Sequence, residues 1–285
     1  MRIIRDPGKL NRLLKMLSRN GRSIGFVPTM GALHLGHLSL IKQAVKDNDT
    51  VVVSIFVNPT QFGPKEDLKK YPRSLKSDLK LCRKAGVGLV FLPDNKIMYS
   101  EGFSTLVNVE GLSNLLCGAA RPGHFRGVAT VMAKLLNIVM PDALYLGQKD
   151  AQQAVIIKRM IVDLNFQVKV KVMLTVREKN GLAMSSRNLY LNQGQKLDAR
   201  VLFKALSLAK SLIEHGQRDT GRIISRMREL ILKKKQIKID YIAIVDLEKL
   251  TEIKKIKQNC LIALAARIGK VRLIDNKLIH RVADV

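Results

Sequence analysis

Two patterns of apolar residues alternate along the first part of the chain: stretches with a helical period and short uninterrupted runs. The helical period predicts helices over residues 10–17, 36–46, 75–85, 128–139 and 151–164, and the runs predict strands over 24–28, 51–57, 88–92, 142–146 and 168–172. The run 51–57 is apolar on both faces, which is typical of a parallel strand covered by helices. The alternation predicts an α/β fold, a Rossmann-like doubly wound parallel sheet.

The pattern changes after about residue 180. Helices are expected over 199–215 and 220–234, followed by strands over 239–245, 261–268 and 271–274, which indicates a smaller C-terminal α+β domain. The stretch 177–181 is polar and marks the boundary. We therefore expect one domain over residues 1–177 and another over residues 178–285.

Loops with polar residues directly follow several predicted strands. His34, Asn58, Gly147 and Thr175 each lie just beyond the end of such a strand. In doubly wound sheets, ligands bind at the carboxyl ends of the strands, near the point where the strand order reverses. We therefore expect these loops to converge on one pocket although they are far apart in the sequence.

Composition narrows the class of protein. The 285 residues are 47% hydrophobic, without an apolar run long enough to cross a bilayer, and no secretory segment opens the chain. A cytoplasmic protein without a membrane partner is expected. Cys82, Cys117 and Cys260 are far apart, so neither a disulfide framework nor a zinc cluster is indicated and buried free thiols are expected.

The formal net charge of +27 raises the question of a nucleic-acid partner. The lysines are dispersed over amphipathic helices, aromatic residues make up only 5% of the chain and Trp is absent, so base-stacking platforms are scarce. We therefore expect no specific nucleic-acid partner. The charge predicts instead a surface potential that attracts small anions such as ATP.

The segment 25–37 runs from an apolar strand through a Gly-rich turn into a helix with His34 and His37 at its start. N–H groups of a first helical turn carry partial positive charge, and two imidazoles beside them add hydrogen bonds to a phosphoryl group. A single His there is more often a hydrogen-bonded core residue. The pair, with Gly31 and Gly36 allowing close approach of the backbone, favours phosphoryl chemistry.

Three further segments carry polar groups suited to the same chemistry. Asn58 and Gln61 offer uncharged donors and acceptors, although an Asn-Pro turn explains them equally well. In the segment 146–153, Lys149 places an ammonium for phosphate oxygens and Asp150 suits a helix cap, a ribose or a metal-bound water. Gln152 and Gln153 point in different directions on a helix, so only one is expected to face the site. The loop 181–188 is rich in hydroxyl groups and ends in a guanidinium, or is a plain helix cap.

These segments together resemble a known family. The His-x-Gly-His string is similar to the HIGH signature of the nucleotidylyltransferase superfamily, and the loop 181–188 is similar to its KMSKS loop, with Arg187 where the second lysine would be. The segments 28–37, 54–63, 121–128, 149–153 and 181–188 occur in the order found in the pantothenate synthetase family. The resemblance implies an ATP-dependent ligase that joins pantoate to β-alanine through pantoyl adenylate and releases AMP and pyrophosphate. It also implies Mg²⁺ held mainly by the ATP phosphates, a homodimer, and a second domain that acts as a lid.

The resemblance also implies roles for particular residues. His37 would be the catalytic proton donor, assisted by His34 and Lys149. Gln61 and Gln153 would bind pantoate, and Gln61 would also face β-alanine. The residues that would contact ATP are Met30, Gly31, Ala32, Leu33, His34, Leu35, Gly36, His37, Gly147, Gln148, Lys149, Asp150, Val176, Met184, Ser185, Ser186 and Arg187.

Four positions depart from the family pattern. Leu35 and Gln148 stand where Glu is usual, Gly88 where an acidic residue is common, and Cys117 where Glu precedes the Gly-x-x-Arg-Pro segment. All four lose negative charge, and none is assigned to direct catalysis. Two other functions stay open: a related nucleotidylyltransferase that uses another acceptor, against which the Gln61 and Gln153 segments argue, and a nucleic-acid-binding protein on a ligase fold.

Overall fold

The computed structural model describes residues 1–64 and 66–280, which form two compact units. The first unit comprises Met1–Ser113, Arg121–Gln148 and Gln153–Leu174. The second comprises Asn114–Ala120, Lys149–Gln152 and the chain from Thr175 onward. Among the described residues, no helix is both long enough and apolar enough to cross a membrane.

The first unit is built on a six-stranded sheet in which every neighbouring pair is parallel. The strand order is β1-β4-β3-β2-β5-β6, so the chain moves toward one edge after β2 and toward the other after β5. The order reverses between β2 and β5, where a doubly wound sheet places its ligand site. The strands are β1 (Arg2–Ile4), β2 (Ile24–Thr29), β3 (Thr50–Ile55), β4 (Leu89–Phe91), β5 (Ala143–Gly147) and β6 (Lys169–Met173).

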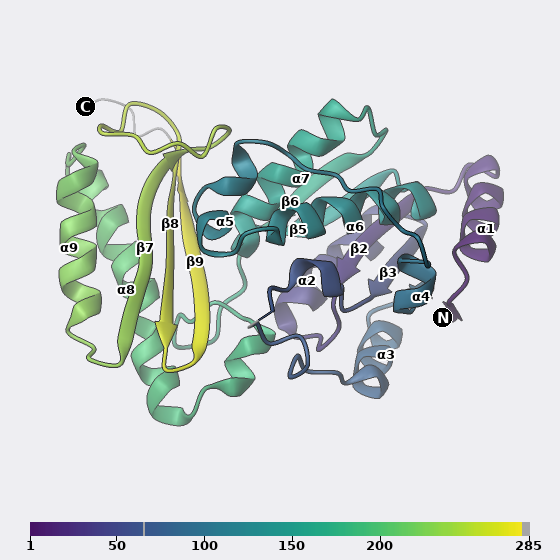
Figure 1. Ribbon diagram of the computed structural model, residues 1–285, viewed down its shortest axis with the longest axis horizontal. Coiled ribbons are helices and arrows are strands. Elements are labelled where there is room, and N and C mark those ends of the chain that lie inside the picture. Colours follow the sequence, from purple (N-terminus) through teal and green to yellow (C-terminus); the bar gives the residue numbers. More distant parts are fainter. Residues whose placement is uncertain (65, 281–285) are drawn as a thin grey trace. The chain divides into compact units, whose positions relative to one another are not determined.

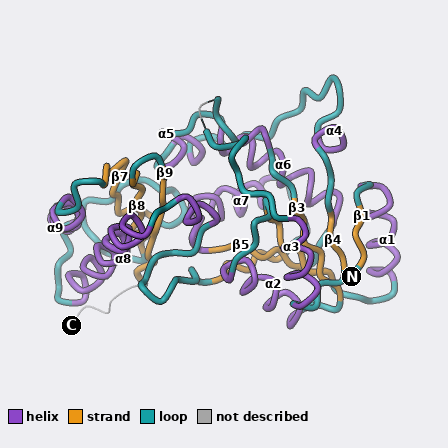
Figure 2. Tube along the Cα trace, turned by 90° about the horizontal axis from the view of Figure 1, so that it is seen from below, coloured by secondary structure: helices purple, strands orange, loops and turns teal. Residues whose placement is uncertain are grey.

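Helices cover both faces of this sheet (Figure 1). α2 (Leu35–Asp47) and α3 (Leu75–Lys84) lie on one face, while α6 (His124–Val139) and α7 (Ala151–Asp163) lie on the other. The short helix α4 (Asn95–Met98) follows β4. Figure 2 shows β1 at the outer edge of the sheet beside β4, with α1 (Pro7–Arg19) alongside it.

The face under α2 shows why these residues form the fold. The apolar residues of α2, with those of β2, β3 and β5 and with Cys82 of α3, make one buried cluster. Burial of such side chains stabilises the fold by about 1.5–3 kcal/mol for each large aliphatic residue. On the opposite face, α6 packs closely against the short helix η1 (Pro59–Gln61). A Cβ atom added at Gly127 would lie only 2.3 Å from the carbonyl oxygen of Thr60, so only glycine fits there.

The second unit is an antiparallel sheet in the order β7-β8-β9, with α8 and α9 packed on it (Figure 1). Its elements are α5 (Cys117–Ala120), η4 (Ser186–Tyr190), α8 (Gln193–Glu214), α9 (Thr220–Leu232), β7 (Ile237–Asp246), β8 (Cys260–Ile268) and β9 (Val271–Ile279). One apolar cluster from both helices and all three strands forms its core. The predicted α/β fold with a smaller α+β part is confirmed.

Several element boundaries differ from the sequence-based prediction. β3 ends at Ile55 rather than at residue 57, and β9 continues to Ile279 rather than ending at residue 274. α6 begins at His124, directly after Gly123 with φ of 80°. α8 begins at Gln193 because Asn192 caps it, accepting a hydrogen bond from the Gln195 backbone N–H. β1 was not predicted.

Candidate active site

The loop that carries the two histidines lies at the reversal point of the sheet. It joins the end of β2 to the start of α2. β2 lies between β3 and β5, with Phe26 paired to Leu144 of β5. Because these three strands are parallel, the loops that hold His34, Asn58 and Gly147 leave the sheet at the same end, and their convergence on one pocket stays a prediction. Thr175 belongs to the second unit.

The two histidines cap α2 with their own side chains. His34 is the N-cap residue, and its Nδ1 accepts a hydrogen bond from the Gly36 backbone N–H at 3.1 Å. His37 Nδ1 accepts from the His34 backbone N–H at 3.3 Å. The ring centroids are 4.1 Å apart, so the two imidazoles lie side by side.

This capping fixes which ring nitrogen carries the proton. A backbone N–H only donates, so each Nδ1 must be the acceptor. In a neutral imidazole the proton then resides on Nε2. Both His34 and His37 are therefore set as Nε2–H donors, the form that a ring needs to hydrogen-bond a phosphoryl oxygen.

The backbone of this loop differs from our expectation. We expected the N–H groups at the start of α2 to be free for phosphate. The N–H groups of Ala32 and Leu33 instead donate to the carboxylate of Asp78, and those of His34 and Gly36 donate to the imidazoles. Of these four groups only the Gly36 N–H lies in the first turn of α2, so the expectation of an N–H free for phosphate was wrong at that position, and the imidazole rings are the better candidates for phosphate donors.

Gln61 is held at a defined orientation beside this loop. The Gly127 carbonyl only accepts, so Asn58 must turn its Nδ2 toward it, at 3.1 Å. Asn58 Nδ2 also donates to Gln61 Oε1 at 3.0 Å. Gln61 Nε2 therefore points the other way and donates to Met30 Sδ at 3.1 Å. The hydroxyl of Tyr99 donates to Asn58 Oδ1 at 2.6 Å, which also fixes the orientation of the Asn58 amide.

The backbone of Gln61 is held by a second group of polar residues. Its carbonyl oxygen lies 2.8 Å from His124 Nδ1 and accepts from Arg121 Nη2 at 3.3 Å. Arg121 also forms two hydrogen bonds of 2.6 Å with the carboxylate of Glu66. Burial alone would raise the pKa of Glu66, but the bonds and charge of Arg121 outweigh it, and the pKa is lowered.

In the sequence, the segment 121–128 is only part of a motif, and we expected no particular role for Arg121, His124 or Tyr99. The dense polar residues of the Arg-Pro-Gly-His-Phe-Arg-Gly string were the available signal for the first two. No sequence signal singles out Tyr99, because its contact with Asn58 spans 41 residues of chain.

The third segment lies around the start of α7 and is divided between the units: Lys149–Gln152 belong to the second, and Gly147, Gln148 and Gln153 to the first. Lys149 Nζ lies 3.5 Å from Asp150 Oδ1, and the Lys149 carbonyl accepts from the buried Asn276 of β9 at 2.9 Å. Gln152 is buried and bonds to the backbone of Leu115 and Cys117, whereas Gln153 is half-buried and no hydrogen bond from the described residues occupies its amide. Gln152 is thus held by hydrogen bonds inside the protein and Gln153 is not, which agrees with the expectation that the two side chains point in different directions.

The fourth segment is folded back on the chain before it, also within the second unit. The Met184 N–H donates to the Val176 carbonyl at 3.0 Å, so these two predicted ATP contacts lie together. Ser185 Oγ accepts from the Arg187 N–H at 3.2 Å. Asn188 Nδ2 donates to Glu178 Oε1 at 2.9 Å and anchors the end of the loop.

An ion pair holds the same loop to β9. Arg177 forms hydrogen bonds of 2.6 and 2.9 Å with the carboxylate of Asp275, which is only 4% exposed. Arg177 Nη1 also donates to the Gly181 carbonyl, and its guanidinium lies 4.4 Å from the ring centroid of Phe203. These contacts hold the Arg177 guanidinium in place and order the backbone next to Val176.

The predicted site residues fall into two groups. In the first unit, the structure brings Met30, His34, His37 and Gln61 together through the loop and the Gln61 contact, and Gly147 ends the neighbouring strand β5. A Cβ atom added at Gly147 would meet no protein atom within 4 Å, so packing does not require glycine there. The second unit carries Lys149, Asp150 and the predicted residues of the segment 176–187, whereas Gln148 and Gln153 belong to the first unit.

The three cysteines are buried and free, as predicted. Burial raises the pKa of Cys82 and of Cys260 to about 11. Cys117, where the family pattern has Glu, lies 3.1 Å from the Tyr241 hydroxyl and 3.6 Å from Arg272 Nη1. Arg272 is paired instead with Asp240 at 2.7 Å, so its charge keeps a partner without the missing carboxylate.

Within the described ranges, no group of three or more His, Cys, Asp or Glu side chains is placed to hold a metal ion. These residues do not fit a metal site made by the protein alone.

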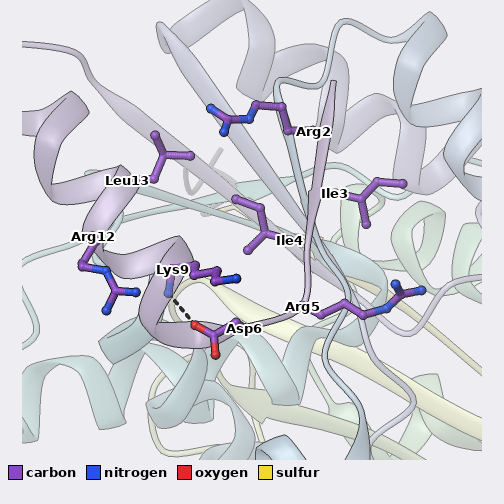
Figure 3. Close-up of a pocket in the computed structure, with 8 residues that line it drawn as sticks. All are labelled: Arg2, Ile3, Ile4, Arg5, Asp6, Lys9, Arg12 and Leu13. Atoms are coloured by element: carbon purple, nitrogen blue, oxygen red, sulfur yellow. Dashed lines mark hydrogen bonds between the residues drawn. The ribbon is translucent and has the colours of Figure 1, made fainter.

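A pocket of about 540 Å³ opens elsewhere on the first unit, between β1 and the start of α1 (Figure 3). Four exposed cations, Arg2, Arg5, Lys9 and Arg12, line it, and the Asp6 carboxylate is already bonded to the Lys9 N–H. β1 is three strands from β2, which is about 14 Å at the usual strand spacing. None of the predicted site residues lines this pocket.

Known proteins similar to this chain match it over nearly its whole length. The sequence profile of the pantoate-beta-alanine ligase family matches residues 2–278. A pantothenate synthetase of Fervidobacterium nodosum is 53% identical over 280 residues, which cover 98% of this chain and 100% of the relative. The crystal structure of pantothenate synthetase from Thermus thermophilus is similar with a TM-score of 0.93 and 43% identity, covering 97% of this chain and 99% of that one. A pantoate-beta-alanine ligase from Francisella tularensis, complexed with beta-gamma ATP and beta-alanine, gives a TM-score of 0.80 and 36% identity, covering 98% of this chain and 97% of that one.

Proposed function

Because the chain belongs to the pantoate-beta-alanine ligase family, we propose that it condenses pantoate with β-alanine at the site described above. ATP is the second substrate. The reaction passes through pantoyl adenylate and yields pantothenate, AMP and pyrophosphate.

The observation that carries the proposal is the histidine pair at the reversal point of the sheet. The backbone of α2 holds both rings in the form that donates from Nε2. Two neutral donors placed side by side suit an α-phosphate whose equatorial oxygens gain charge as the new bond forms. We assign His37 as the main catalytic residue and His34 as its assistant.

In the first step, the pantoate carboxylate attacks the α-phosphorus of ATP and pyrophosphate leaves. The carboxylate is already ionised at neutral pH, since such groups titrate near a pKa of about 4, so this attack needs no general base. The obstacle is repulsion between anions. We assign its reduction to Lys149 and Arg187, with Ser185, Ser186 and the two imidazoles donating hydrogen bonds.

Gln61 and Gln153 are assigned to pantoate. The Gly127, Asn58 and Tyr99 contacts leave Gln61 Nε2 as the amide group able to face a ligand, displacing its contact with Met30. Gln61 then offers N–H donors, which suit the carboxylate and hydroxyl oxygens of pantoate. Gln153 is half-buried and makes no hydrogen bond to the described part of the chain, so its amide is ready for a ligand.

In the second step, the β-alanine amine attacks the acyl carbon of the adenylate, the amide forms and AMP leaves. The mixed anhydride must be kept from water until then. That residues 178–285 serve as a lid remains a prediction of the family resemblance, as do the homodimer, Mg²⁺ bound with ATP and a cytoplasmic location.

The test is an AMP-release assay with ATP, Mg²⁺, pantoate and β-alanine, in which each component is omitted in turn. We expect AMP only when all four are present, and pantoate-dependent exchange between ATP and pyrophosphate when β-alanine is left out. Equal AMP release with another acceptor in place of pantoate would contradict the assignment.

The same exchange assay tests the histidine. His37→Ala should lower the exchange rate by about 100-fold or more, the usual effect of removing one transition-state donor. Circular dichroism and thermal unfolding should show an intact fold. Near-normal exchange in the folded variant would rule out the catalytic role of His37.

A further inference from the structure

Asp78 is a buried carboxylate for which the proposed chemistry has no use. It lies on α3 and is only 1% exposed. None of the ion pairs among the described residues includes it, although a buried carboxylate is costly unless it is paired or hydrogen-bonded. Its interactions should therefore reveal what it does.

Both oxygens of Asp78 bind the loop between β2 and α2. Oδ2 accepts from the Ala32 N–H at 3.0 Å, and Oδ1 accepts from the Leu33 N–H at 2.8 Å. Ser74 Oγ adds a third hydrogen bond to Oδ1 at 3.2 Å. A carboxylate on two consecutive backbone N–H groups is the arrangement by which a backbone nest binds an anion.

The loop adopts an unusual backbone conformation to make these bonds. Gly31 and Ala32 both have positive φ, 79° and 49°, a region that L-residues such as alanine rarely enter. A Cβ atom added at Gly31 would lie 3.0 Å from Asp78 Oδ2. The preceding N–H, that of Gly31, donates to Thr29 Oγ1 at 3.2 Å, and Thr29 Oγ1 donates to the Ser54 carbonyl at 2.7 Å.

These contacts place the histidine pair. The chain enters the loop from β2, turns over the Asp78 carboxylate and reaches the N-cap residue His34 one residue after Leu33. We propose that Asp78 is a positioning residue of the ligase: its carboxylate acts as an internal anion that fixes the loop and so aligns the two imidazoles with the α-phosphate of ATP. This inference rests on the proposed function.

A positioning residue and a residue that merely stabilises the fold differ in the kinetic constants that their loss changes. A misplaced catalytic group costs about 100-fold in rate for a displacement near 1 Å, so Asp78→Asn should lower kcat/KM for ATP by about that factor. The new amide nitrogen would face a backbone N–H, donor against donor. The KM values for pantoate and β-alanine should stay near those of the wild type, because Gln61 is held by other residues.

Two variants serve as controls. Asp49→Asn changes an exposed aspartate that also accepts a backbone N–H and a hydroxyl, both from Ser23, outside the loop. Ser74→Ala removes one bond to Asp78 but leaves both backbone bonds. Both variants should keep a kcat/KM for ATP close to that of the wild type. Suppose instead that Asp78→Asn impairs kcat/KM for ATP and also raises the KM values for pantoate and β-alanine, with a matching fall in thermal stability. That result would indicate a purely structural role and overturn the proposal.

A measurement on the wild-type protein covers the case in which Asp78→Asn does not fold. The amide hydrogens of Ala32 and Leu33 should exchange slowly with solvent although they lie in a loop. Adding ATP should shift the ring Nε2 resonances of His34 and His37 more than these two amides. Fast exchange of both amides would overturn the proposal. Wild-type protein that makes no pantoate-dependent AMP would overturn the proposed function instead.

Discussion

At the scale of single residues, His34 serves two purposes that are usually separate. Its Nδ1 caps α2, and its Nε2–H is the group assigned to phosphate. Helix caps are most often Ser, Thr, Asp or Asn, which supply an oxygen but no ring N–H donor of this kind. A histidine at this N-cap position therefore indicates a chemical role as well as the start of a helix.

Two substitutions separate the purposes. Asn at position 34 can accept the Gly36 N–H with its own oxygen, so His34→Asn should keep the stability of the wild type, while His34→Ala should lower the free energy of unfolding by about 1 kcal/mol. Both should lower the exchange rate between ATP and pyrophosphate. Urea unfolding and the exchange assay measure the two effects. Equal stability of the two variants would show that the capping bond contributes nothing.

At the scale of elements, the contact between α6 and η1 sets the position of Gln61. The helix approaches so closely that its Gly127 carbonyl reaches Asn58, which in turn bonds to Gln61. The Gln61 carbonyl is held by Arg121 and His124, and Arg121 is bonded in turn to Glu66. Packing of these two elements therefore fixes the orientation of the Gln61 amide, the group that we assign to pantoate.

Gly127→Ala tests this contact. The added Cβ would lie 2.3 Å from the Thr60 carbonyl oxygen, so the elements must separate, at a cost of about 1–3 kcal/mol of unfolding free energy. The KM for pantoate should rise as Gln61 shifts. Gly88→Ala is the matched control, because its nearest atom would be 3.8 Å away and the residue is exposed just before β4. Similar losses in both variants would contradict the argument.

The Glu66 carboxylate gives the same region a pH dependence. Its folded-state pKa lies below the ordinary 4.5, so the stability that it contributes is present above pH 4.5 and is lost as the pH falls through the folded-state value. The stability difference between wild type and Glu66→Gln should be largest at neutral pH and shrink in acid. Urea unfolding over a pH series measures it. A difference that does not change with pH would contradict the assignment.

Much of the fold followed from the sequence because the central strands are uninterrupted apolar runs that leave little choice of face. β1 was missed because a strand of only three residues, Arg2–Ile4, is too short to show a period, and its pairing with β4 joins distant parts of the chain. The histidine pair was found because it is contiguous. Asp78 was not, because a lone aspartate in an amphipathic helix looks like part of a solvated face until its bonds to the loop 31–33 are seen.

At the scale of the whole molecule, the formal charge of +27 makes an electrostatic prediction. A positive surface potential speeds the encounter with the ATP anion, and salt screens it. kcat/KM for ATP should therefore fall several-fold between low and molar sodium chloride, while the KM for β-alanine, which has no net charge, should change little. Parallel steady-state assays check this. Equal salt effects on both substrates would show that the charge does not steer ATP.

The strand order also bears on how the chain is made. β1 leaves the ribosome before the other five strands of its sheet, but its neighbour in the sheet is β4, which ends at Phe91. The β2–β3 pair needs only residues 24–55 and emerges complete well before that. A nascent polypeptide can thus pair the middle of this sheet first, whereas β1 has no strand to pair with until about 85 further residues have been added.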